Sequence, residues 1–230
     1  FSDALGHSGF TGIAIGVLCG AAFPIWWAVG LAVAFALLFS FVRSRSSQSA
    51  DTIIGVFSST AVALGIFIAT MGGGSFTKFN KYLIGDILSV TPAEIGALAL
   101  VLLAVAVLWV LTSNQLILTA IHPQLAASRG LKTARNETFF TVVIAVVVTL
   151  AMSWVGLMVI NSLLVLPAAS ARNVAKNVRQ YHLLSVLGAL LSSVAGLILA
   201  YYLGCSAGAT IALLLALCFA VTFAFRRIRA

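Results

Sequence analysis

The strongest constraint on how this chain folds is a series of long apolar runs. A strand of a membrane barrel crosses the bilayer in about 10 residues and alternates apolar with polar side chains, whereas these runs are longer and do not alternate. Only 8% of the 230 residues are charged, against about 25% in an average soluble domain. So few charges could not cover the surface of a soluble protein. The sequence therefore predicts an all-α, polytopic helical membrane protein.

About eight transmembrane segments are predicted. They lie near residues 4–19, 21–42, 52–71, 95–112, 139–158, 159–171, 183–203 and 207–225. Because about 20 helical residues are needed to cross the hydrocarbon core, we expect 4–19 and 159–171 to be broken, tilted or sheltered by neighbouring helices. We expect residues 1–230 to form a single transmembrane domain. The abrupt start inside a motif also leads us to expect one further helix upstream.

The lysines and arginines are distributed unevenly between the two predicted sides of the membrane. With eight alternating spans, four clusters fall on one side and only Lys78 and Lys81 on the other. The clusters are Arg43 and Arg45; Arg129, Lys132 and Arg135; Arg172, Lys176 and Arg179; and Arg226, Arg227 and Arg229. The positive-inside rule makes the side with the four clusters cytoplasmic. The net charge of +8 is therefore a signal of topology, and it gives no reason to expect nucleic-acid binding.

The long outer connection contains a short apolar piece, Tyr82–Val90, that cannot span a membrane. Thr91 and Glu94 then form a capping box with Pro92 at the first helical position, so a new helix is predicted to start there. Tyr82–Val90 is therefore predicted to be a re-entrant half-helix. Within it, Asp86 has two interpretations: a cap for neighbouring backbone amides, or a residue on an ion path.

The long cytoplasmic connection is predicted to hold a short amphipathic helix, from about His122 to Arg129. Gly130 is placed to end this helix as a C-cap. A helix of this kind either lies on the lipid surface or docks onto a cytoplasmic partner. Its alanines and Gly130 would let the groove of a partner approach closely, which favours docking.

The first segment carries an ionisable pair, Asp3 and His7, whose spacing places both side chains and Thr11 on one helix face. Ionisable groups are costly in a membrane and usually mark a function. Imidazole and carboxylate suit zinc and manganese, whereas copper(I) would require sulfur. Two ligands leave a tetrahedral zinc site incomplete, so water or other helices must complete it. The alternative is a hydrogen bond that only fixes helix packing. The adjoining face carries small residues that permit close packing, namely Ala4, Ser8, Gly12, Gly16 and Gly20.

Several motifs together resemble the membrane permeases of zinc and manganese uptake ABC transporters, most closely the bacterial zinc-uptake branch. The motifs are FSDALGHSGFTGIAIG, YLIGDILSVTPAEI, HPQLAASRGLKTARNE, VGLMVINSLLVLPAASARNVAKN and SAGATIAL. The resemblance implies a homodimeric permease in the bacterial inner membrane, a cytoplasmic ATPase dimer, and a periplasmic or lipid-anchored metal-binding protein. It implies zinc or manganese as cargo and no permanently bound cofactor.

The same resemblance assigns roles to particular residues. Asp3 and His7 match positions associated with metal passage, and a partner copy of the chain could supply further ligands. The loop matching residues 122–135 is the coupling helix of the family, which sits in a cleft of the ATPase. The residues expected to make this contact are His122, Pro123, Leu125, Ala126, Ala127, Arg129 and Gly130.

The sequence lacks the phosphate-binding motif GxxxxGK[ST], so ATP hydrolysis would have to occur on a separate polypeptide and the chain is not expected to be an enzyme. The sequence bears on four alternative functions. A metalloenzyme would need a motif such as HExxH, which is absent. A gradient-driven transporter would leave the cytoplasmic helix idle. A vitamin B12 or siderophore permease would not need Asp3 and His7. A manganese or iron importer of the same family stays open.

Overall fold

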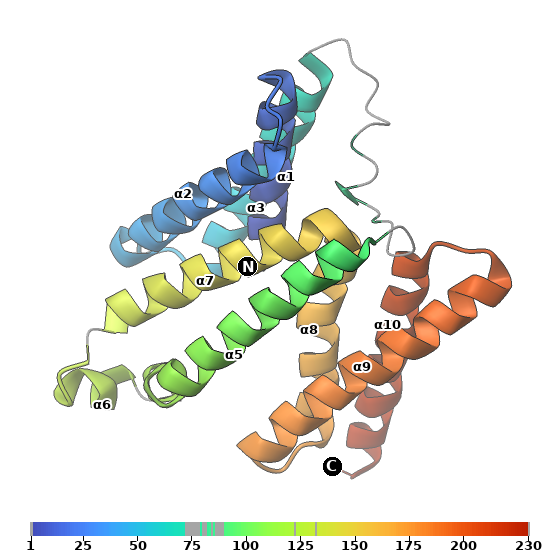
Figure 1. The fold of residues 1–230 in the computed structure, drawn as a ribbon. Helices are drawn as coiled ribbons and strands as arrows, with labels where there is room; N and C mark the ends of the chain where they lie inside the picture. The colour runs from blue at the N-terminus through green and yellow to red at the C-terminus, as the bar shows by residue number, and fades with distance from the viewer. Residues whose placement is uncertain are drawn as a thin grey trace. The chain divides into compact units, whose positions relative to one another are not determined.

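The computed structural model describes residues 2–71, 79, 82–83, 85, 90–121, 123–131 and 133–229. Within these ranges helices are the only regular secondary structure, and turns connect them. This confirms the predicted all-α class. Figure 1 shows the helices in chain order. They are α1 (Ser2–Leu18), α2 (Pro24–Arg45), α3 (Ala50–Met71), α5 (Pro92–Ile121), α6 (Pro123–Ser128), α7 (Thr133–Val155), α8 (Leu157–Val174), α9 (Val178–Leu203) and α10 (Ala207–Arg229).

Seven helices in the described ranges are long and apolar enough to cross a membrane: α2, α3, α5, α7, α8, α9 and α10. The eighth long helix, α1, has 17 residues, of which eleven are buried. This burial agrees with the prediction that the first segment is sheltered by neighbouring helices. The seven long apolar helices confirm a multi-pass membrane protein.

Some helix boundaries differ from those predicted. Helix α5 continues to Ile121, well past the predicted end at residue 112. The polar residues from Thr112 onwards suggested a break, but the Thr112 hydroxyl donates to the carbonyl oxygen of Leu108 at 2.6 Å, so the helix itself satisfies this group. The turn between α7 and α8 lies at Gly156, two residues earlier than predicted, where φ is +94°. Glycine adopts this conformation without the steric cost of a side chain.

One of two compact units consists of Phe1–Phe76 and Val90–Ala151. In this unit α1 packs against both α2 and α3 (Figure 1). A core cluster of fully buried residues joins α1, α2 and α7, and it consists of Leu5, Ala32, Ala36 and Ala145. The alanines allow these helices to approach closely, and α1 is held in the interior of the unit as a result.

The second unit consists of Thr77–Ser89 and Met152–Ala230. Helix α8 packs against α9 and α10 around Val159, Ile211 and Leu215. A Cβ atom at Gly85 would overlap the carbonyl oxygen of Val155, so the backbone at Gly85 packs directly on the turn between α7 and α8. Most of the predicted half-helix Tyr82–Val90, including Asp86, lies outside the described residues.

Two local sequence signals are confirmed. The backbone N–H and the hydroxyl of Thr91 donate to Glu94 Oε2 at 2.7 and 2.8 Å, and Pro92 is the first residue of α5. This is the predicted capping box. The short helix α6 ends where predicted, because Gly130 has φ of +76° and donates its N–H to the carbonyl oxygen of Ala127 at 2.9 Å.

Candidate functional site

The small-residue face of α1 lies against α2. A Cβ atom at Gly12 would lie 2.5 Å from Ala28 Cα, and one at Gly16 would lie 3.0 Å from Pro24 Cα. Ala4 and Ser8, on the same face, are also buried. Gly20 does not belong to this contact, because it follows the end of α1 and is exposed. The predicted close packing therefore extends over four of the five positions.

The polar face of α1 meets α3. Thr11 is only 3% exposed, and its hydroxyl lies 2.8 Å from the carbonyl oxygen of Ala61 in α3 and 2.9 Å from that of His7. The glycine at position 65 makes room for this contact, since a Cβ atom there would lie 2.8 Å from Thr11 Oγ1. The hydrogen bond to Ala61 fixes how α1 is rotated relative to α3, and it thereby sets the direction of the other polar side chains on this face.

Asp3 and His7 contact each other and α3. His7 Nε2 lies 3.3 Å from Asp3 Oδ1, and the Ser58 hydroxyl donates to Asp3 Oδ2 at 2.8 Å. The side chain of Asp3 is 53% exposed and that of His7 is 22% exposed. The pair therefore forms an open site at the edge of the α1–α3 contact, which an ion can reach from outside the unit.

The distance between the two candidate ligand atoms suits a metal ion. Zinc binds nitrogen and oxygen ligands at about 2.0–2.2 Å in a tetrahedron, whose edges are then about 3.3–3.6 Å long. The Asp3–His7 separation of 3.3 Å falls at the short end of this range. The Ser58 hydroxyl donates a hydrogen bond to the second carboxylate oxygen of Asp3, Oδ2, and so fixes the orientation of the carboxylate. An ion shared by both atoms would lie off the line that joins them, so the two side chains would turn to direct their lone pairs at it.

Ser58 was not identified from the sequence. The signal was present, because residues 58–60 place three hydroxyl groups in succession inside an apolar span. A hydroxyl in a membrane helix can usually bond to its own backbone, however, and the sequence does not show which helix faces it. Within the described ranges, no three His, Cys, Asp or Glu side chains come together to hold a metal. Asp3 and His7 must therefore share any ion with other donor groups.

The candidate coupling residues lie on and around α6. Pro123 is the first residue of this helix, and His122 lies outside the described residues. Leu125, Ala127, Arg129 and Gly130 are exposed, whereas Ala126 is fully buried within its unit. The surface that α6 presents to a partner consists of the exposed residues, and Ala126 packs inward beneath them.

Comparison with known proteins identifies the family. The model of the ABC 3 transport family matches residues 1–226. The chain belongs to the ABC 3 transport family. This family assignment confirms the resemblance seen in the sequence motifs, and ABC 3 family membership agrees with the multi-pass helical fold.

Individual ABC 3 relatives cover nearly all of the chain. It is 26% identical over 229 residues to the high-affinity zinc uptake system membrane protein ZnuB of Haemophilus influenzae, covering 100% of this chain and 87% of that protein. It is 32% identical over 225 residues to the manganese import system permease protein ScaB of Streptococcus gordonii, and the match covers 96% of this chain and 79% of that protein. A solved structure, PsaBC from Streptococcus pneumoniae in complex with Fab, superposes with a TM-score of 0.82 at 28% identity, covering 96% of this chain and 79% of that one.

Proposed function

We propose that the chain is the permease subunit of an ATP-driven importer of divalent metal, with zinc as the preferred ion. The observation that carries this proposal is the carboxylate–imidazole contact of Asp3 with His7 on α1, with the Asp3 carboxylate oriented by Ser58 of α3. Relatives named for zinc uptake and for manganese import support the class of cargo. Manganese or iron is the alternative cargo within the same family.

In this proposal Asp3 and His7 bind the ion in transit and do not hold it permanently. Asp3 offers Oδ1, His7 offers Nε2, and the Ser58 hydroxyl keeps the carboxylate in place through Oδ2. The remaining ligands are water, or groups from a second copy of the chain. An ion with so few protein ligands can leave again when its surroundings change, which a transport site requires.

The energy comes from a partner. The chain has no phosphate-binding loop of its own, so a cytoplasmic ATPase dimer hydrolyses ATP while two permease copies form the pathway in the bacterial inner membrane. An external metal-binding protein, periplasmic or lipid-anchored, delivers the ion. The vitamin B12 and siderophore class is disfavoured, because bulky ligands give no reason for a carboxylate–imidazole pair on a tightly packed helix.

The proposal is tested by reconstituting the permease with its ATPase in proteoliposomes and measuring uptake of radioactive zinc. Uptake is expected to require both the ATPase and ATP, and unlabelled zinc should suppress it at lower concentration than manganese or iron. If manganese or iron competes more strongly than zinc, the cargo is assigned wrongly. Zinc uptake in the absence of the ATPase would contradict an ATP-driven importer and favour a gradient-driven transporter.

A second prediction concerns the coupling helix. Ala127→Trp is expected to weaken binding of the ATPase by about 5- to 150-fold, since overpacking a docking surface costs about 1–3 kcal/mol. Ala127 is exposed on α6, so the substitution should not disturb the fold of the permease. Binding is measured by retention of the ATPase on the immobilised permease.

The matched control for this variant is Ala209→Trp, an exposed alanine near the start of α10, at the end of that helix predicted to face the outside. The control should bind the ATPase normally. If Ala127→Trp also binds the ATPase normally and supports normal transport, α6 is a lipid-surface helix.

A further inference from the structure

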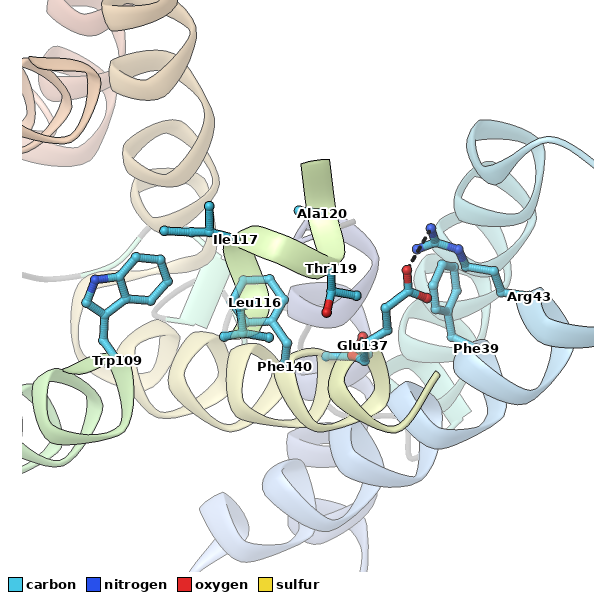
Figure 2. A pocket seen from close by; sticks show the side chains of 10 residues that line it. Phe39, Arg43, Trp109, Leu116, Ile117, Thr119, Ala120, Glu137 and Phe140 are labelled. Atoms are coloured by element: carbon cyan, nitrogen blue, oxygen red, sulfur yellow. Dashed lines mark hydrogen bonds and ion pairs between the residues drawn. The ribbon is translucent and has the colours of Figure 1, made fainter. Parts of the chain in front are cut away.

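We infer that one end of the first unit carries a binding site for an anionic phospholipid, formed by two adjoining cavities between α2, α5 and α7. The site lies at the end of these helices that holds Arg43 and the first turn of α7. By the positive-inside rule this is the predicted cytoplasmic end, where the membrane leaflet is rich in anionic lipid. Figure 2 shows the residues around the first cavity.

The first cavity is suited to an acyl chain. It has a volume of about 370 Å³, within the range of about 300–1,000 Å³ that is typical of ligand pockets. Its walls are mainly apolar, with Trp109, Leu116 and Ile117 from α5 facing Phe140 of α7 (Figure 2). The eight residue steps from Trp109 to Ile117 correspond to about 12 Å along the helix axis. The cavity therefore extends from the end of the helices toward the hydrocarbon region.

The second cavity is suited to a phosphate headgroup. It has a volume of about 580 Å³ and shares four lining residues with the first, which are Phe39, Arg43, Glu137 and Thr141. The additional lining includes Arg135 and the hydroxyl groups of Ser40, Ser44, Thr133 and Thr138. Hydroxyl and guanidinium groups donate hydrogen bonds to phosphate oxygens. The first turn of α7 lies in the same wall, and the N-terminal end of a helix favours an anion.

The charges at the junction of the cavities favour an anionic ligand. Arg43 Nη2 and Glu137 Oε1 are 3.9 Å apart, and the two side chains are 49% and 52% exposed. A pair this long and this exposed is weak, so a phosphate can compete for Arg43. Arg135 forms no ion pair with any described residue. The described lining of the two cavities thus includes two arginines and one carboxylate, which gives it a net charge of +1.

The test uses Trp109 as a reporter of lipid in the cavity. Trp26, Trp27 and Trp154 are replaced by Phe, and the purified permease–ATPase complex is titrated with phosphatidylglycerol or phosphatidylcholine that carries brominated acyl chains, which quench nearby tryptophan fluorescence. Brominated phosphatidylglycerol should reach half-maximal quenching at a concentration several-fold lower than brominated phosphatidylcholine does.

Charge variants then separate a lipid site from a structural ion pair. Arg43→Gln and Arg135→Gln should each raise the phosphatidylglycerol concentration for half-maximal quenching by about fivefold. Glu137→Gln should lower it, because the competing carboxylate is removed. The matched control Arg179→Gln, an exposed arginine in the other unit, should change nothing. As a second measurement, mass spectrometry gives the amount of phosphatidylglycerol that co-purifies with each protein. This amount should be lower in Arg43→Gln and Arg135→Gln than in the wild type, and higher in Glu137→Gln.

Three results would overturn the inference. Equal quenching by both lipids would show a non-specific apolar contact. No quenching by either lipid, with no co-purified phosphatidylglycerol, would show that a second copy or the ATPase covers the cavity. Weaker phosphatidylglycerol binding in both Arg43→Gln and Glu137→Gln would show that the Arg43–Glu137 ion pair supports the fold. In that case Glu137 does not compete with a lipid headgroup for Arg43.

Discussion

His7→Ala is expected to lower zinc uptake per folded permease molecule by more than about tenfold. Changing a residue that only supports a metal ligand typically costs about 10- to 100-fold in affinity or activity, and His7 is proposed to be a ligand itself. Asp3→Asn should have a comparable effect, because it removes the charge while keeping the shape of the side chain. Ser58→Ala should have a smaller effect, since Ser58 only orients the Asp3 carboxylate through a 2.8 Å hydrogen bond.

The measurement that decides this is uptake normalised to the amount of folded permease in the membrane. Asp51→Asn serves as the matched control, because Asp51 is an exposed carboxylate in the first turn of α3 and lies outside the site. If Asp3 and His7 only form a structural hydrogen bond, their variants will accumulate poorly but transport normally per molecule. Normal uptake per molecule in both variants would end the proposal that they are ligands.

Gly12→Ala is expected to destabilise the permease by about 2 kcal/mol or more, because the added Cβ would lie 2.5 Å from Ala28 Cα and 2.7 Å from the Trp27 carbonyl oxygen. Both neighbours are backbone atoms, so no side-chain rotation relieves the overlap and α1 must move away from α2. That movement would also shift the polar face of α1 from α3. Zinc uptake should therefore fall together with stability.

The matched control for this prediction is Gly30→Ala, which makes the same change in α2 at a position with no atom within 4 Å of the new Cβ. Thermal unfolding of the two purified variants in the same detergent gives the comparison. Gly30→Ala should unfold at or slightly above the wild-type temperature, since alanine favours a helix over glycine. Equal melting temperatures for Gly12→Ala and the wild type would contradict the close packing of α1 on α2.

The sequence predicted those features whose partners lie nearby in the chain. The capping box joins Thr91 to Glu94, three residues apart, and the end of α6 depends on Gly130 bonding to Ala127. Each forms within a single turn, so residue type and spacing are sufficient to predict it. The close-packing face of α1 was also predictable, because small residues at every fourth position are the pattern that lets membrane helices pack closely.

Features that depend on which helices become neighbours were not predictable. Ser58 lies 55 residues from Asp3, and nothing in its local sequence indicates that it faces α1. The two cavities likewise draw their linings from α2, α5 and α7. The end of α5 was predicted wrongly for a different reason, because the apolar run ends at residue 112, whereas the helix continues and the Thr112 hydroxyl bonds back into it.

The hydrogen bonds between α1 and α3 also affect how the chain is made. During synthesis α1 leaves the ribosome before α3 exists, so Asp3 has no Ser58 hydroxyl and Thr11 has no Ala61 carbonyl to bond with. Ionisable groups in a membrane segment are costly unless they are partnered, and at this stage both Asp3, in the first turn of α1, and Thr11 lack the partners on α3 that they have in the folded unit. We therefore expect α1 to wait beside the translocon until α2 and α3 emerge, and the three helices to enter the bilayer as one group.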